Sequence, residues 1–318
     1  MKIQALLALA AVLSSVPAAH GAEPAAPVFN TTTYGSIEVA GEVAGTRIAY
    51  REAGPRDAPT ILLLHGFPSS RMFTTLIPLL ADRFHLVAPD YPGFGQSDAP
   101  PPEAFAYTFD RLAAAVDGFT QALGLTRYAL YVQDYGGPVG FRLALAHPGR
   151  VSAIIVQNAV AHDFGISGPL WDARKAFWVD PGADAEKVRQ NLISPAAARQ
   201  RHLGASPHPE RYDPDLWTDE AALLARPGQG RLQLDLFYDY RTNPAAYPSW
   251  QAWLRERQPP LLVAWGRYDP SFEVAEAYKK DVPGAEVHVL DAGHFALDEA
   301  VVEVAGLIRS FMDRRVAR

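Results

Sequence analysis

Three residues of this sequence could together carry out hydrolysis by a nucleophile: Asp134, Asp269 and His294. Asp134 follows the apolar run Tyr128–Gln133 and precedes two glycines, which is the pattern of a buried strand that turns sharply into a helix. Such a turn, a nucleophile elbow, exposes its central side chain at the end of the strand. An aspartate there can attack a saturated carbon and form an alkyl ester on its own carboxylate, which water then hydrolyses.

The other two residues also follow predicted strands. Asp269 comes after the apolar run 261–265, and His294 comes after the run 286–290. Open α/β sheets place their sites at the carboxyl ends of strands, so we expect the three side chains to meet. Asp134 would attack, His294 would activate water, and Asp269 would hold the imidazole and stabilise its positive charge. Asp269 could also cap the turn that begins after Pro270.

A loop after the buried run 61–64 predicts the remaining part of the site. It reads His65-Gly66-Phe67-Pro68. Loops at this place supply one backbone N–H to an oxyanion hole, and the residue after the nucleophile supplies another, so we assign the two donors to the backbones of Phe67 and Tyr135. Each such donor contributes about 2.7 to 4 kcal/mol to catalysis. We expect His65 to be a structural hydrogen-bonding residue rather than a base.

The elements that must position these residues alternate between strands and helices. We expect antiparallel strands within 38–50, strands at 61–64, 84–88, 128–133, 151–157, 261–265 and 286–290, and helices at 70–83, 109–123, 137–146, 274–281 and 295–312. The alternation stops between about 160 and 247, where the chain is helical. The pattern predicts an α/β fold, a mostly parallel twisted sheet with helices on both faces and an inserted helical cap. We place the core at residues 36–159 and 247–318, the cap at 160–246, and the pocket between them.

Composition limits the partners. With 318 residues, 48% of them hydrophobic, the chain can bury a large core. Its net charge of -6 and its lack of basic clusters argue against nucleic-acid binding and against attraction to anionic membranes. The absence of cysteine excludes disulfides, thiolate ligands and a cysteine nucleophile. The histidine spacing indicates no metal site, no cofactor is implied, and nothing indicates the oligomeric state.

The first 21 residues have the pattern of a signal peptide. Lys2 is followed by an apolar stretch from Ala5 to Val16, and small residues stand at Ala19 and Gly21. The apolar stretch is short for a transmembrane span. We therefore expect a periplasmic or secreted protein with a flexible N-terminus at residues 22–35 and no stable membrane insertion after cleavage.

Five motifs occur in order along the chain. They are H-G-F-P at 65–68, D-Y-P-G-F-G-Q-S at 90–97, V-Q-D-Y-G-G at 132–137, G-R-Y-D-P at 266–270 and D-A-G-H-F at 291–295. With them the chain resembles the α/β-hydrolase superfamily over about residues 37–312, and within it the branch of epoxide hydrolases and haloalkane dehalogenases. The resemblance implies a triad of Asp134, Asp269 and His294. It also implies a small apolar substrate that carries an epoxide oxygen or a halide on saturated carbon.

The cap residues bear on the choice between epoxide and halide. Epoxide hydrolases that this chain resembles use two cap tyrosines to bind the ring oxygen; Tyr240 resembles the second, and Arg174 stands where the first is expected. Haloalkane dehalogenases usually carry tryptophan after the nucleophile, where this chain has Tyr135, although Trp171 or Trp178 could donate to a halide. We predict an epoxide hydrolase that forms vicinal diols, with Tyr240, Arg174 and Trp178 as contacts to the substrate or leaving group. The alternatives are a haloalkane dehalogenase and a weakly catalytic binding protein of this fold.

Overall fold

The computed structural model describes residues 32–43, 45–182 and 184–316. The expected signal peptide and most of the expected flexible N-terminus lie outside these residues. The flexible segment was predicted too long, because strand β1 (Thr33–Glu38) already pairs antiparallel with β2 (Arg47–Ala53) from Thr33 onward. Among the described helices, none is both long enough and apolar enough to cross a membrane.

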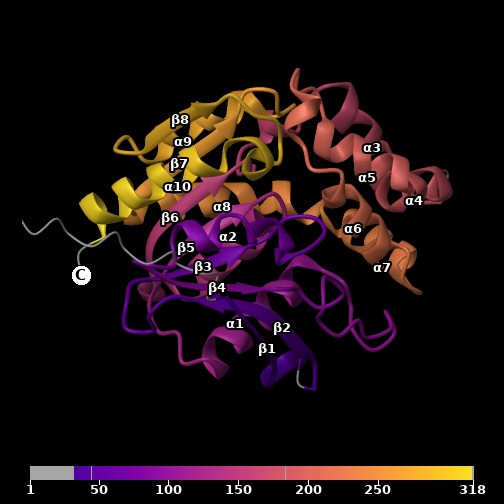
Figure 1. The fold of residues 1–318 in the computed structure, drawn as a ribbon. Coiled ribbons are helices and arrows are strands. Elements are labelled where there is room, and N and C mark those ends of the chain that lie inside the picture. Colours follow the sequence, from indigo (N-terminus) through magenta and orange to yellow (C-terminus); the bar gives the residue numbers. More distant parts are fainter. Residues whose placement is uncertain (1–31, 44, 183, 317–318) are drawn as a thin grey trace, which may run out of the picture. The chain divides into compact units, whose positions relative to one another are not determined.

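The described strands form one sheet in the order β1-β2-β4-β3-β5-β6-β7-β8 (Figure 1). The remaining strands are β3 (Thr60–Leu64), β4 (His85–Pro89), β5 (Tyr128–Gln133), β6 (Val151–Gln157), β7 (Leu261–Gly266) and β8 (Glu286–Leu290). The pairs β1–β2 and β2–β4 are antiparallel, and the other pairs are parallel. This confirms the predicted mostly parallel sheet.

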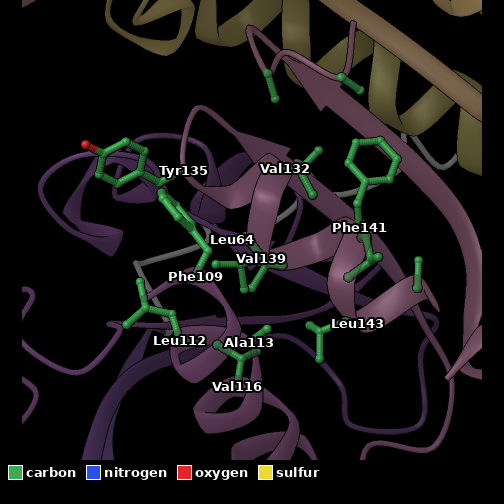
Figure 2. Packing of buried hydrophobic residues seen from close by; sticks show 14 of the residues in the cluster. Leu64, Phe109, Leu112, Ala113, Val116, Val132, Tyr135, Val139, Phe141 and Leu143 are labelled. Atoms are coloured by element: carbon green, nitrogen blue, oxygen red, sulfur yellow. The ribbon is translucent and has the colours of Figure 1, made fainter. Parts of the chain in front are cut away.

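Helices cover both faces of the sheet, and the alternation of side chains along each strand explains how. In β3, Ile61 and Leu63 belong to one hydrophobic core cluster, together with buried residues of α10 (Ala296–Arg315). Leu62 and Leu64 belong to a second cluster, together with buried residues of α1 (Phe109–Ala122), α2 (Gly136–Ala146) and α8 (Thr242–Arg257). Successive side chains of a strand point to opposite faces, so a strand buried on both faces must be apolar throughout. Figure 2 shows Leu64 packed in the second of these two clusters.

One predicted helix is wrong. Residues 70–83 form two short 3-10 helices, η2 (Ser70–Phe73) and η3 (Ile77–Leu79), instead of one α-helix. Pro78 lies inside this segment and has no N–H to donate, which interrupts an α-helical hydrogen-bond ladder. The apolar side chains that suggested a helix are nevertheless buried. The helix predicted at 274–281 is likewise a 3-10 helix, η7 (Phe272–Ala277), followed by one turn, α9 (Tyr278–Asp281).

Between β6 and β7 the chain leaves the sheet. This segment contains the helices α3 (Pro169–Val179), α4 (Ala185–Ile193), α5 (Pro195–Leu203), α6 (Asp215–Leu224) and α7 (Gln229–Asp239), which lie together in Figure 1. The last helix of the segment, α8, packs against α2 of the core. Trp250 stacks on Phe141 of α2 at 5.2 Å between ring centroids, and Arg142 of α2 donates to the side-chain oxygen of Asn243 at 2.8 Å. The predicted boundary between residues 246 and 247 therefore falls inside α8.

Candidate active site

Asp134 lies at the turn between β5 and α2 with a backbone φ of 46°, in the left-handed region that strains a residue other than glycine. The turn is held by its own backbone, because the N–H of Asp134 donates to the carbonyl of Asn158 at 3.3 Å and its carbonyl accepts from Gly137 at 2.9 Å. Only glycine fits beside it: a Cβ on Gly136 would lie 2.1 Å from the carbonyl oxygen of Leu64. The carboxylate is thereby presented, partly exposed, at the end of β5.

Asp269 and His294 meet at the same edge of the sheet. Nδ1 of His294 donates to Oδ2 of Asp269, which also accepts from Nδ2 of Asn158 at 2.8 Å. The other carboxylate oxygen accepts from the N–H of Ser271 at 2.6 Å, so Asp269 orients the imidazole and caps the following turn at once. Burial acts to raise the pKa of Asp269, but the charge and hydrogen bond of His294 outweigh it and hold that pKa below its usual value.

The pKa of His294 is shifted in the opposite direction. Burial acts to lower it, whereas the charge and hydrogen bond of Asp269 and the charge of Asp134 raise it, and the net result lies above the usual 6.5. The three predicted residues therefore lie close enough for the charges of Asp269 and Asp134 to raise the pKa of His294. An imidazole with a raised pKa accepts a proton more readily, which suits a base that must take one from water.

The predicted oxyanion donors flank the nucleophile. The N–H of Phe67 points at Oδ2 of Asp134 at 3.4 Å. Tyr135 directly precedes α2, where backbone N–H groups have no partner within the helix. The phenol ring of Tyr135 is buried and packs against Phe109 at 5.2 Å between centroids, which holds the backbone at this position.

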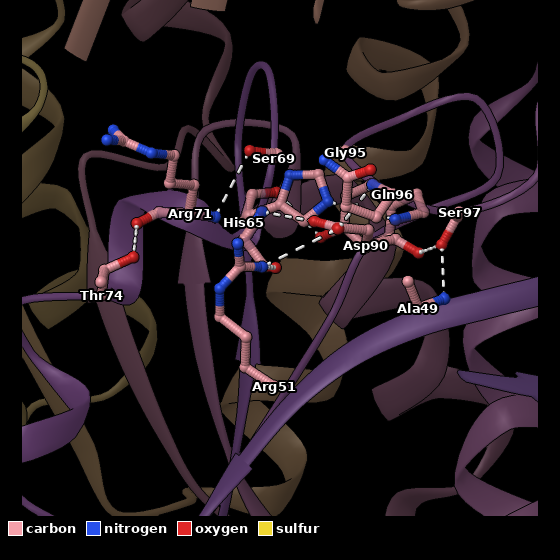
Figure 3. Close-up of polar contacts among 12 residues, drawn as sticks. Ala49, Arg51, His65, Ser69, Arg71, Thr74, Asp90, Gly95, Gln96 and Ser97 are labelled. Carbon is pink, nitrogen blue, oxygen red and sulfur yellow. Dashed lines mark hydrogen bonds and ion pairs between the residues drawn. The ribbon is translucent and has the colours of Figure 1, made fainter. Parts of the chain in front are cut away.

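Buried polar residues hold the Phe67 loop in place (Figure 3). His65 accepts from the N–H of Tyr91 at 3.2 Å, and Asp90 accepts from the N–H groups of Ser70 at 2.7 Å and Gln96 at 2.9 Å. Burial lowers the pKa of His65 to about 4, so this histidine is neutral at pH 7. His65 therefore has the structural role expected from the sequence, and it ties the H-G-F-P loop to the loop after β4.

The match to known families decides the class. Residues 59–301 match the family described as the alpha/beta hydrolase fold, which is more than half of the chain. The chain belongs to this family.

The relatives agree with this assignment. An uncharacterized hydrolase of Saccharomyces cerevisiae is 44% identical over 267 residues, covering 82% of this chain and 91% of the relative. A haloalkane dehalogenase of Mycobacterium marinum is 30% identical over 278 residues, covering 83% and 88%. The solved structure of the epoxide hydrolase CorEH covers 89% of this chain and 99% of its own, with a TM-score of 0.73 and 20% identity. This α/β-hydrolase is therefore a hydrolase related to haloalkane dehalogenases, and it shares its fold with an epoxide hydrolase.

Tyr240 packs in a cluster of aromatic rings that includes Tyr135, the residue after the nucleophile. Its ring is 6.1 Å from that of Tyr135, 5.3 Å from that of Trp171 and 6.0 Å from that of Trp178, measured between centroids. Burial, with contributions from the neighbouring Tyr247 and from the charge of Asp134, raises the pKa of Tyr240 well above 10. Its hydroxyl is thus protonated at pH 7, with the hydroxyl of Tyr247 as its neighbour.

The two other predicted cap contacts differ from each other. The indole N–H of Trp178 donates to the carbonyl of Phe237 at 3.1 Å. A neighbouring helix therefore uses that donor, while the ring of Trp178 stacks on that of Tyr240; the predicted contact of Trp178 with the substrate or leaving group stays a prediction. Arg174 lies over the ring of Trp171 at 4.5 Å, and its positive charge acts on Tyr135, Tyr240 and His294. Arg174 therefore remains near the site with its N–H groups available.

Sequence reasoning missed two buried residues beside the triad. Nε2 of Gln133 lies 3.3 Å from Nε2 of His294, and a Cβ on Gly66 would come within 2.0 Å of the Gln133 side-chain oxygen. Asn158, with φ of 47°, supports both Asp134 and Asp269. Each is a polar residue at or just after the end of an apolar strand that is buried on both faces, and that pattern could have drawn attention to them.

Two cavities near the cap do not include the nucleophile. One is lined by Pro68 and Phe94 of the core loops and by Leu224 and Gln233 of the cap, and it lies beside the oxyanion loop. The other, of about 360 Å³, is lined by Tyr107, Arg231, Asp235 and Tyr238 among others. Within the described part of the chain, no group of three or more histidine, cysteine, aspartate and glutamate residues could hold a metal ion.

Proposed function

We propose that this α/β-hydrolase converts epoxides to vicinal diols through an alkyl ester on Asp134. The observation that carries the proposal is an aspartate, not a serine, at the strained turn, with the His294–Asp269 pair beside it. A carboxylate has no hydroxyl group with which to form a serine-type acyl-enzyme. It can instead displace a leaving group from saturated carbon.

In the first step a carboxylate oxygen of Asp134 forms a bond to a ring carbon, and the bond between that carbon and the ring oxygen breaks. The oxygen becomes an alkoxide, which takes the hydroxyl proton of Tyr240. Tyr240 suits this role because its raised pKa keeps it protonated until a strong base forms beside it. The resulting tyrosinate is reprotonated from solvent.

In the second step His294 removes a proton from water, and the hydroxide attacks the carbonyl carbon of the Asp134 ester. The negative oxygen that develops accepts hydrogen bonds from the N–H groups of Phe67 and Tyr135. Asp269 stabilises the imidazolium. Collapse breaks the acyl–oxygen bond, and the diol oxygen takes the proton from His294. The carboxylic acid left on Asp134 releases its proton to solvent, which restores the carboxylate and balances the proton that Tyr240 takes up.

The choice of epoxide over halide depends on which donors face the leaving group. A departing halide needs N–H donors. The indole N–H of Trp178 is committed to Phe237 and the residue after the nucleophile is Tyr135, which leaves Trp171 and Arg174 as the candidate donors to a halide. A departing alkoxide needs a proton, which the Tyr240 hydroxyl can supply. This comparison favours epoxides over the haloalkanes that some relatives are named for.

A single turnover of styrene oxide in ¹⁸O-labelled water tests the covalent step. The expected result is an unlabelled diol and a label in Asp134, because solvent oxygen enters the carboxylate. A labelled first-turnover diol with unlabelled Asp134 would contradict the mechanism. Asp134→Asn should abolish turnover, whereas Asp172→Asn, at an exposed cap aspartate, should not. Halide release from a haloalkane panel without any diol from epoxides would instead identify a dehalogenase.

Export from the cytoplasm is a separate proposal, supported by the pattern of residues 1–21. The mass of the protein recovered after expression in a bacterium tests it. A mature chain that begins at Ala22 in the periplasmic fraction is expected, and a full-length cytoplasmic protein would contradict it.

A further inference from the structure

Arg174 on α3 is a charged residue near the nucleophile that has no counter-ion among the described residues. Its guanidinium lies over the Trp171 ring at 4.5 Å and over the Phe237 ring at 5.8 Å, and both rings are buried. No described residue forms a hydrogen bond or an ion pair with it. A guanidinium stacked on an aromatic ring keeps its fork of N–H donors free for another partner.

Arg201 provides a contrast within the same cap. It also lies over an aromatic ring near the site, that of Phe67, at 4.5 Å. Its donors, however, are used: Nε donates to Glu220 at 2.8 Å and a terminal nitrogen donates to the carbonyl of Leu192 at 2.7 Å. The cap therefore neutralises one arginine beside the site and leaves the other with its donors free.

Arg174 is also not the partner of the nucleophile. Asp134 and Arg174 form no ion pair, although a chain of ring contacts leads from Arg174 through Trp171 and Tyr240 to Tyr135, the residue after Asp134. A partly buried guanidinium without an anion is costly, and a ligand that supplies the anion recovers that cost. The planar fork of donors matches a carboxylate, which it can bind through two parallel hydrogen bonds.

We propose that Arg174 binds a carboxylate on the substrate, so that the preferred substrates are epoxides with an apolar body and a carboxylate next to the ring. This inference rests on the proposed epoxide hydrolysis for its substrate class. The carboxylate replaces the missing counter-ion of Arg174 and orients the ring between Asp134 and Tyr240. It also refines the substrate expected from the sequence, which was apolar throughout.

The selectivity of the enzyme between an acid and a neutral analogue tests the proposal. The probes are trans-3-phenylglycidate and its amide, which differ in charge and share the epoxide. The expected result is a higher kcat/KM for the acid, with a ratio that falls at least about 10-fold in Arg174→Met, as for the loss of a hydrogen bond between charged groups. Arg174→Lys should retain part of the preference. Arg199→Met, at an exposed arginine over Trp217, is the matched control and should leave the ratio unchanged.

An unreactive ligand separates this proposal from the proposed function. trans-2-Phenylcyclopropanecarboxylate cannot be opened, and its binding can be followed by tryptophan fluorescence with the carboxamide as the neutral control. Arg174-dependent binding of the acid without epoxide turnover would support the anion site and overturn epoxide hydrolysis. Epoxide turnover with no preference for the acid would overturn the anion site and leave the function standing. An equal loss of acid and amide turnover in Arg174→Met would also overturn the anion site, since Arg174 would then act on the ring oxygen that both substrates share.

Discussion

Replacing His202 by glutamine should destabilise the protein strongly at pH 7 and weakly at pH 9. His202 lies on α5 of the cap, with Nε2 3.1 Å from Glu220 on α6 and Nδ1 2.8 Å from Asp298 on α10. The three side chains are at most 7% exposed, so solvent screens their interaction little. The ring of His202 also stacks on Phe295, which follows the catalytic candidate His294.

The expected size follows from proton linkage. Burial acts to lower the pKa of His202, but hydrogen bonds to Asp298 and Glu220 and their charges raise it to about 9. A raised pKa means that the folded state binds the proton more tightly, so the stabilisation is fully present below pH 6.5 and is lost as pH rises through 9. For a change from 6.5 to about 9, the charge contributes about 2.5 kcal/mol at pH 7 and about 0.4 kcal/mol at pH 9.

Urea unfolding followed by tryptophan fluorescence, at pH 6 to 9, measures the difference between wild type and His202→Gln. The gap in unfolding free energy should narrow by about 2 kcal/mol between pH 7 and pH 9. His208→Gln is the control, because that histidine and its carboxylate partners are more exposed and such pairs contribute at most about 1 kcal/mol. A gap for His202→Gln that stays constant with pH would refute the reasoning, since the charge would then not be what stabilises this contact.

Three further changes test the site. Asn158→Ala should cost about 2 to 4 kcal/mol in urea unfolding, because it removes a hydrogen bond to buried Asp269 at a left-handed position; a loss below about 0.5 kcal/mol would contradict this. Gly66→Ala should reduce kcat about 10-fold or more in steady-state assays, because its Cβ would lie 2.0 Å from the Gln133 oxygen; wild-type kcat would argue against the crowding. The pH profile of kcat should have an acidic limb, in which activity falls as the pH drops through the pKa of His294 above 6.5, because the imidazole must be neutral to accept a proton. Asp269→Asn should move this limb to lower pH, because it removes the charge that raises the pKa of His294. An unmoved limb would mean that another group titrates.

The sheet was largely predictable, because its central strands are buried on both faces. β5 and β6 were predicted at their observed bounds because they are largely apolar runs between turn residues. β8, also predicted at its observed bounds, is a half-exposed edge strand in which polar and apolar residues alternate from Glu286 to Val289. The segment 70–83 was not, because the same apolar spacing is satisfied by 3-10 turns once a proline interrupts the α-helical ladder. Hydrophobic spacing reports which side chains are buried more reliably than it reports the helix type.

The part of the candidate site that lies at the ends of strands could be predicted from the sequence. Asp134, Asp269 and His294 could be chosen from their types and their places after apolar runs, because the carboxyl ends of parallel strands share one edge of the sheet. Asn158 and Gln133 could not be assigned roles in this way, because their partners are 111 and 161 residues away along the chain. Their importance depends on contacts that no local pattern contains.

The sequence by itself determined the class of fold, the aspartate at the turn and the order of the three candidate residues, because these follow from local periodicity and residue chemistry. Tertiary structure decided which donors remain available. The folded chain pairs the indole N–H of Trp178 with the carbonyl of Phe237 and pairs Arg201 with Glu220, whereas Arg174 has no counter-ion among the described residues. Such choices depend on which distant groups lie within hydrogen-bonding distance after packing, and for the cap helices that is a property of the folded chain.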